Sequence, residues 1–351
     1  MSENFEIEKE YVNCNLCNAD NTQLLFTGKD RRFKKEGLFN VVKCKECGLI
    51  YLNPRPTQVD IGYYYPTEYW PYRKIGFEDI GIMGEGKGKF AYLKNWIKKT
   101  ILEEYYKYDF KNLGKRKESA NLFKKILVFP FLSKYREIYY ETIPFFDKGK
   151  VLDIGCASGS YLAWLKELGW EPYGVEINEN CIKFAREEYG IDIFCGDLLE
   201  ANFPDNFFDC ITMMQFLHLS HHPLETLRET NRILKQNGLV VISLPNINSL
   251  EFKTLKEKTF LVDIPRHLYD FSACTLKKML EKSGFRTKKL IYSDNMHTSL
   301  WSIQYFFEEK GYEIKIGNQW RLNPLVKLIG RLLSLFHQST IMTFYASKSS
   351  F

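Results

Sequence analysis

The sequence predicts an α/β fold whose C-terminal part is a doubly wound, mostly parallel sheet of seven strands. Three observations predict this organisation: strand and helix patterns alternate after residue 148, two cysteine pairs lie near the N-terminus, and a tyrosine- and lysine-rich segment with helical patterning separates these regions. Strands that alternate with helices are typical of parallel sheets covered on both faces. We therefore divide the chain into a small cysteine-containing module at 1–56, a helical linker or lid at 57–147 and an α/β domain at 148–351.

Each predicted strand is a short apolar run, and each predicted helix repeats apolar residues every three or four positions. The strands are expected at residues 150–154, 171–175, 192–195, 208–213, 239–244, 286–293 and 340–347. The helices between them are expected at 160–168, 179–189, 223–235 and 275–283. The last strand follows a long excursion, so we expect it to lie antiparallel at the edge of the sheet. Upstream, helical patterning is clearest at 89–108 and 120–141.

The composition is that of a globular protein with a substantial core. The chain has 351 residues, 45% of them hydrophobic, and a formal net charge of +6. That charge is too small to indicate nucleic acid by itself, and no apolar run reaches the ~20 residues needed to cross a bilayer. The acidic, polar N-terminus shows no secretory signal, and the nine cysteines follow no secreted disulfide pattern. We expect a cytoplasmic protein.

The most informative segment is VLDIGCASG at 151–159, an apolar run that ends in an aspartate and turns on Gly155 and Gly159. A buried strand that leads into a glycine loop and a helix is typical of nucleoside-cofactor sites at the carboxyl edge of a parallel sheet. The loop does not fit the GxGxxG pattern of nicotinamide enzymes.

Three carboxylates fit S-adenosylmethionine (SAM) better. Asp153 comes directly before the loop, where it can meet the ammonium group of a bound amino acid. Glu176 ends the second strand and can accept hydrogen bonds from ribose hydroxyls, and Asp197 follows the third strand, where it can accept one from adenine.

The ordered blocks DIGCASG, GVE, GD, FPDNFFDCI and LKQNGLVVISLPN resemble the class I SAM-dependent methyltransferases, which have a Rossmann-like fold. The resemblance covers the C-terminal region and implies SAM as cofactor. It adds Gln215, at the start of the loop after the fourth strand, to the expected cofactor-binding residues. Ala157 departs from the family, which usually has a second glycine there.

Two CxxC pairs predict a structural zinc site. Cys14, Cys17, Cys44 and Cys47 can place four thiolates around one ion, which is the set that structural zinc prefers. Coincidental pairs and a redox dithiol are the alternatives. A redox CxxC normally opens a helix, and neither pair does.

The cysteine module extends the resemblance. The blocks CNLCN, CKECGLIYLNPRP, YYYPTEYW and LVDIPRHLYDFSACTL resemble a bacterial subgroup with an N-terminal zinc ribbon in surface-polysaccharide pathways. The chain is also similar to sugar C-methyltransferases and, in the core, to ubiquinone-pathway O-methyltransferases. This resemblance implies methyl transfer to a sugar, a nucleotide-sugar or a lipid-linked glycan.

Candidate catalytic groups are expected on the loops after the fourth and fifth strands, because the enzyme must align an acceptor and remove its proton. His218 stands where related proteins usually have a glutamate, and an imidazole is suited to act as a base near neutral pH. The alternative is a histidine that lines the pocket or caps the next helix. We expect His221 and His222 to face solvent at the start of that helix.

The second candidate patch is DIPRHLY at 263–269, in the connection after the fifth strand. Arg266 and Tyr269 could bind a phosphate or a sugar, and His267 could be the base. The alternative is a structural lid in which His267 packs and Tyr269 bonds to the backbone.

Two other functions stay open at this stage. An RNA methyltransferase could use the zinc ribbon and the basic helices to bind nucleic acid, although no RNA-type catalytic motif is present and we expect no nucleic-acid partner. A SAM-binding module without catalysis is suggested by His218, which replaces the glutamate of the Leu-Glu-His sequence usual in related proteins.

Two amphipathic segments that contain basic residues lie at 87–125 and 325–336. We favour core packing with a solvated basic face, or a dimer contact, for them. The alternative is that they lie on an anionic membrane or cover a lipid-linked glycan. The methyl acceptor, the atom methylated and the oligomeric state are not predicted.

Overall fold

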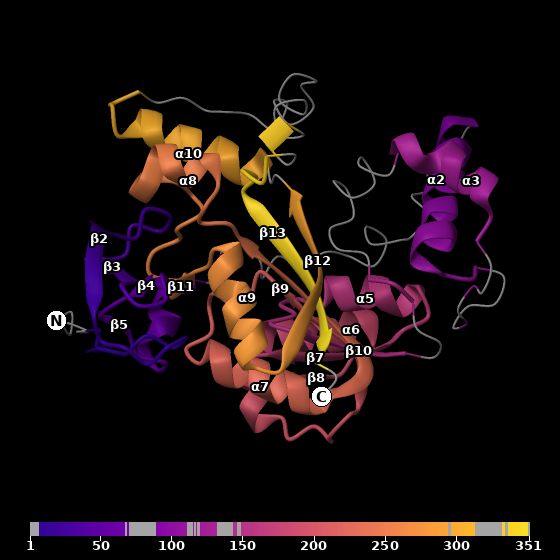
Figure 1. Cartoon of the computed structure of the whole chain (residues 1–351), viewed down its shortest axis with the longest axis horizontal. Coiled ribbons are helices and arrows are strands. Elements are labelled where there is room, and N and C mark those ends of the chain that lie inside the picture. The colour runs from indigo at the N-terminus through magenta and orange to yellow at the C-terminus, as the bar shows by residue number, and fades with distance from the viewer. Residues whose placement is uncertain are drawn as a thin grey trace.

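The computed structural model describes residues 7–66, 69, 89–110, 115, 117, 120–131, 143–145, 149–293, 296–312, 332–333 and 336–349. A seven-stranded sheet forms its centre (Figure 1). In sheet order, the strands are β12 Phe285–Ser293, β13 Ile341–Lys348, β10 Leu234–Pro245, β9 Phe208–Met214, β6 Lys150–Ile154, β7 Glu171–Glu176 and β8 Ile193–Cys195. The seven predicted strands are confirmed to within a few residues at their ends.

The sheet is mixed rather than uniformly parallel. The pairs from β10 across to β8 are parallel, whereas β13 runs antiparallel to both of its neighbours, β10 and β12. The predicted place of this last strand at the edge is wrong, since β13 is second from the edge. Burial explains the order, because β13 is mostly buried, whereas the lysine-containing β12 is largely exposed or half-buried and suits an edge.

Helices cover the two faces of the sheet. On one face, α5 Ser160–Glu167 packs against Val151, Cys210 and Val241, and α6 Glu179–Tyr189 lies over β8. On the other face, α7 Pro223–Ile233 and α9 Ala273–Lys282 join the largest core cluster. Cys210 is fully buried within β9. The doubly wound arrangement is confirmed.

A second sheet of four strands forms the N-terminal module, which we define as residues 7–56. Its order is β11 Tyr269–Asp270, β4 Ile50–Leu52, β3 Phe39–Cys44 and β2 Thr22–Gly28. A separate two-stranded ladder joins β1 Lys9–Glu10 to β5 Arg55–Pro56, and a short 3₁₀ helix, η1, follows at Asp60–Tyr64. Because β11 comes from the connection after β10, the α/β domain contributes an edge strand to the sheet of the module.

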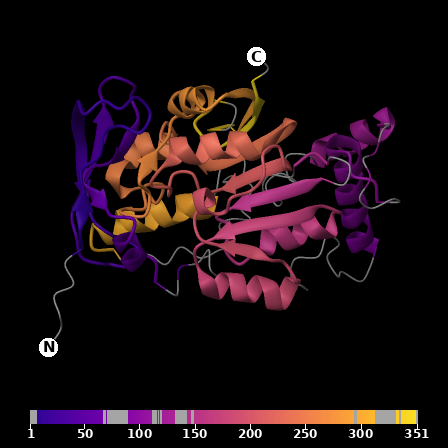
Figure 2. The same cartoon turned by 90° about the horizontal axis from the view of Figure 1, so that it is seen from below.

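The helical insertion contains α2 Lys89–Tyr106, α3 Leu122–Val128 and a 3₁₀ turn, η3, at Phe129–Phe131. The first predicted helix is confirmed, and the second is confirmed as far as residue 131, since 132–142 lie outside the described residues. Figures 1 and 2 show α2 and α3 at the end of the molecule opposite to the N-terminal module.

The described helices also include α8 Leu250–Leu255 and α10 Met296–Glu308, which the sequence did not predict. Most of the predicted stripe at 325–336 lies outside the described residues. Within the described part of the chain, no helix has the length and apolar character needed to span a membrane.

Candidate functional site

The glycine loop folds as a tight turn between β6 and α5. Gly155 and Gly159 have φ of 73° and 74°, where L side chains are strained. A Cβ on Gly155 would lie 2.4 Å from the ring of Phe216, so this backbone approaches the loop after β9 closely. Ala157 adopts φ 47°, so the position where the family usually has glycine keeps a left-handed backbone.

Two carboxylates lie at the ends of the strands that flank this turn. Glu176 is buried, and its Oε2 accepts a hydrogen bond from Ala157 N–H at 2.9 Å, while its Oε1 accepts from the next two backbone N–H groups. Burial raises the pKa of Glu176 although these bonds oppose the rise. Asp153 is also buried and accepts from the Thr212 hydroxyl at 2.6 Å. Both groups are therefore fixed at the carboxyl edge.

The other two predicted cofactor residues lie nearby but are held by local contacts. Asp197 caps the short helix Leu198–Glu200, and its Oδ1 accepts from Leu199 N–H at 2.9 Å. Gln215 adopts φ 60°, and its side-chain Nε2 lies 3.4 Å from the Ser243 hydroxyl of β10. Glycines that admit close backbone approach and buried carboxylates at strand ends fit SAM, whereas the contacts of each residue with it stay predictions.

The four cysteines predicted as metal ligands lie together, with their sulfur atoms all within 4.8 Å of one another. Cys14 Sγ is 3.4 Å from Cys47 Sγ, and Cys17 Sγ is 3.5 Å from Cys44 Sγ. Tetrahedral zinc with bonds of about 2.3 Å places sulfur atoms about 3.8 Å apart, close to these values. The cluster therefore fits zinc.

The two cysteine turns are also alike in their backbone. Cys14 and Cys44 each receive hydrogen bonds from backbone groups two and three residues later. These bonds lower the pKa of Cys44 to about 7 although its burial opposes this, whereas burial raises the pKa of Cys14. Asn18 and Gly48, which follow the second cysteine of each pair, have φ of 64° and 83°. Such N–H groups stabilise thiolates, the form that binds metal.

The two candidate catalytic histidines, which we call the histidine pair, touch each other. His218 Nε2 lies 3.2 Å from His267 Nε2, with the rings nearly perpendicular and their centroids 4.2 Å apart. Burial lowers the pKa of His267 to about 4. Burial and the nearby His267 together lower the pKa of His218 well below 6.5. Both imidazoles are therefore neutral at neutral pH.

The contacts of the pair fix which nitrogens hold protons. His267 Nδ1 lies 2.9 Å from the Leu261 carbonyl oxygen, which can only accept, so Nδ1 is protonated. His267 Nε2 then accepts from His218 Nε2–H, which leaves His218 Nδ1 unprotonated. That nitrogen is buried and has no hydrogen-bond partner in the described structure.

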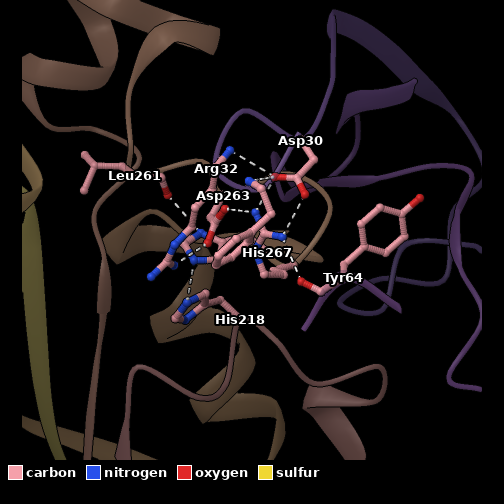
Figure 3. Close-up of polar contacts among 9 residues, drawn as sticks. Asp30, Arg32, Tyr64, His218, Leu261, Asp263 and His267 are labelled. Atoms are coloured by element: carbon pink, nitrogen blue, oxygen red, sulfur yellow. Dashed lines mark hydrogen bonds and ion pairs between the residues drawn. The ribbon is translucent and has the colours of Figure 1, made fainter. Parts of the chain in front are cut away.

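Four charged residues next to the pair, the aspartate–arginine network, join the N-terminal module to the connection after β10 (Figure 3). The fully buried Arg266 donates to Asp30 at 2.7 Å, to Asp263 at 2.5 Å and to the Tyr64 carbonyl oxygen at 2.9 Å. Arg32 donates to Asp263 at 3.0 Å. Two arginines thus balance two aspartates. Because the two aspartates already match the charge of Arg266, its contacts favour the structural alternative, a lid, over binding of a phosphate or a sugar.

Comparisons with known proteins agree with this geometry. Residues 130–290 match a family described as "Methyltransferase domain". That segment is a little under half of the chain, and it supports a SAM-dependent methyltransferase domain there. Demethylmenaquinone methyltransferases of Staphylococcus aureus are 29% identical to it over 139 residues, 38% of this chain and 56% of theirs. The chain thus spans a little over half the length of these curated relatives.

Solved structures of SAM-dependent methyltransferases are also similar to the chain. The enzyme from Archaeoglobus fulgidus is 25% identical, with 65% of this chain and 98% of that one covered and a TM-score of 0.40. The enzyme from Aquifex aeolicus is 16% identical, with 57% and 83% covered and a TM-score of 0.37.

The remaining candidates hold the N-terminal module against the methyltransferase domain. The buried hydroxyl of Tyr269 accepts from Arg55 at 2.8 Å and donates to the His221 carbonyl oxygen at 3.3 Å. His221 itself is buried, with Nε2 3.1 Å from the Pro56 carbonyl oxygen, so its predicted exposure is wrong because the module covers it. His222 is exposed, as predicted. The contacts of Tyr269, like those of Arg266, therefore favour a structural role over binding of a substrate.

His221 and His222 line a polar groove of about 410 Å³ between the N-terminal module and α7. His218 does not line this groove.

Sequence reasoning missed Asp30, Arg32 and Arg55, the partners that the module supplies. Asp30 and Arg32 lie in a run of charges, KDRR at 29–32, which is usually a solvated loop. The available signal was a run of charges followed by an aromatic residue. Such runs are too common in sequences to predict that Asp30 is buried.

Proposed function

We propose that the chain transfers the methyl group of SAM to an acceptor that must lose a proton, a hydroxyl or a carbon acid of a sugar, nucleotide-sugar or lipid-linked glycan. The observation on which this rests is the unprotonated, unpartnered Nδ1 of His218, buried two residues after Phe216, which contacts the glycine loop. A base held next to the cofactor loop is what such an acceptor requires.

The chain holds the groups that the cofactor needs. When bound, SAM supplies an electrophilic methyl group. Gly155 and Gly159 would give its amino-acid part room, Asp153 would face its ammonium, and Glu176 and Asp197 would accept from its ribose and adenine. Structural zinc at the four cysteines would fix the N-terminal module.

The histidine pair gives the proton a defined path. His218 Nδ1 takes the acceptor's proton while His218 Nε2–H passes its own to His267 Nε2, so one proton enters and the positive charge ends on His267. Asp263 favours that charge, since its carboxylate acts to raise the pKa of His267. Because burial lowers both pKa values, both rings are unprotonated at neutral pH but are weak bases, so proton uptake depends on stabilisation of the resulting cation by Asp263.

The sugar class is supported by the whole-chain pattern of cysteine module, methyltransferase core and DIPRHLY connection. A quinone is the second candidate, because the curated relatives that match the core are demethylmenaquinone methyltransferases. Their match spans 139 residues, 38% of this chain, so it does not speak for the chain as a whole.

The test measures tritium transfer from methyl-labelled SAM to a panel of nucleotide-sugars and to demethylmenaquinone. Transfer to a nucleotide-sugar supports the first candidate, and transfer only to the quinone supports the second. If a protein that binds SAM methylates neither class, the proposal is wrong.

Variants test the base with whichever acceptor takes the label. We expect His218→Ala to lower kcat by about 10²–10⁴-fold with SAM affinity unchanged. His222→Gln, in the same loop but exposed, is the control. His267→Leu should lower kcat and alter its pH profile. His267→Gln should retain part of the kcat lost in His267→Leu, because the glutamine amide oxygen can accept a hydrogen bond from His218 Nε2–H.

A further inference from the structure

Helix α3 presents its apolar side chains to solvent rather than to the core. Leu122, Phe123, Ile126 and Leu127 lie on one helical face and are 72%, 74%, 65% and 49% exposed. Only Val128 of this helix is buried. Surface helices of globular proteins normally have the opposite arrangement.

The apolar surface continues beyond the helix. Phe129 and Phe131 in the following turn are 65% and 43% exposed. Together the six exposed side chains present on the order of 600 Å² of apolar area, at the upper limit for a typical monomer. Among the described residues nothing covers them, and this end of the molecule lies opposite to the N-terminal module (Figures 1 and 2).

The segment that carries this surface is basic in sequence. Residues 89–131 contain ten lysines and one arginine against three glutamates and one aspartate. Two of those acids are already matched, because Lys117 pairs with Glu103 and Glu104. Lys124 and Lys125, within α3 itself, are half-buried along the flanks of the apolar face. Long lysine side chains in such positions can reach past an apolar contact to anionic groups.

We propose that this surface, residues 122–131 with the lysines around it, docks on an anionic lipid membrane. Apolar side chains would enter the boundary of the acyl chains, and the lysines would meet the headgroups. A symmetric contact between two copies would bring two strongly basic surfaces together, which opposes self-association. Nucleic acid would match the charge and leave the exposed leucines and phenylalanines without a role. The proposal does not depend on the identity of the methyl acceptor.

The test is flotation of the full-length protein with vesicles of phosphatidylcholine alone or with 30% phosphatidylglycerol. We expect binding to the anionic vesicles, at least tenfold weaker binding to the neutral ones, and release by high salt. The double variant Phe123→Ser, Ile126→Ser should reduce binding at least tenfold. Lys124→Gln and Lys125→Gln should each reduce it roughly fivefold on anionic vesicles only.

Val59→Ser is the matched control, because Val59 is 90% exposed near the N-terminal module at the other end. It should bind like the wild type. Circular dichroism and SAM affinity check that each variant is folded. Failure of the wild type to bind anionic vesicles overturns the proposal, as does unchanged binding by the double variant. A dimer lost in the double variant, without vesicle binding, assigns the surface to self-association instead, and retention on RNA alone assigns it to nucleic acid.

Discussion

Replacement of Arg266 by methionine should destabilise the protein by about 3–5 kcal/mol, because it leaves a buried aspartate without its cation. Asp30 is 2% exposed and would keep only two backbone hydrogen bonds, from the N–H groups of Arg32 and Phe33. Asp263 would keep its bond to Arg32. Because methionine has a similar volume, most of the loss would come from the unpaired charge rather than from a cavity.

A double variant separates these two contributions. Asp30→Asn with Arg266→Met removes both buried charges, so it should recover about 2 kcal/mol of the stability lost in Arg266→Met. Arg232→Met is the control, since Arg232 also pairs with two acids but is 40% exposed. Exposed pairs contribute at most about 1 kcal/mol.

Urea unfolding followed by circular dichroism and tryptophan fluorescence, with zinc present, measures these differences. A loss below about 1 kcal/mol in Arg266→Met would refute the reasoning. So would a double variant whose loss equals the sum of the two single variants.

Three further results are expected. Cys17→Ser should lose bound zinc, measured by metal analysis, whereas Cys195→Ser, an exposed cysteine outside the cluster, should keep it. Glu176→Gln should weaken SAM binding about ten- to a hundredfold by calorimetry, and Glu179→Gln, exposed at the start of α6, should not. Burial holds the pKa of His267 at about 4 in the fold against 6.5 when free, so the unfolded chain binds the extra proton first. Stability should therefore fall by about 3 kcal/mol as the pH drops from 6.5 through 4 in urea titrations, and His267→Gln should remove that part of the slope.

The α/β domain was predictable because its signals are local. The seven strands of the central sheet and the helices α5, α6, α7 and α9 carry their own apolar patterns, and the CxxC spacing itself brings thiolates together. The two candidate histidines could be proposed one at a time from loop position, but their contact could not, since 49 residues separate them in the chain.

The contacts that fix the site depend on long-range pairing. Arg266 meets Asp30 across 236 residues, and nothing near either residue in the sequence indicates it. The strand β11 has two residues, too few for any periodic pattern, and forms only because β4 offers an open edge. The predicted position of β13 was wrong for the same reason, because the order of strands in a sheet depends on which neighbouring strands bury each one.

The strand that β11 adds to the four-stranded sheet means that the N-terminal module is not a detachable part. A chain cut after residue 56 would leave the fully apolar, buried β4 with an unpaired edge on one product and Tyr269 without its stacking partner Tyr51 on the other. Unpaired apolar edges favour aggregation. Exchange of the module for that of another protein would therefore require exchange of the connection after β10 as well, the segment that carries His267.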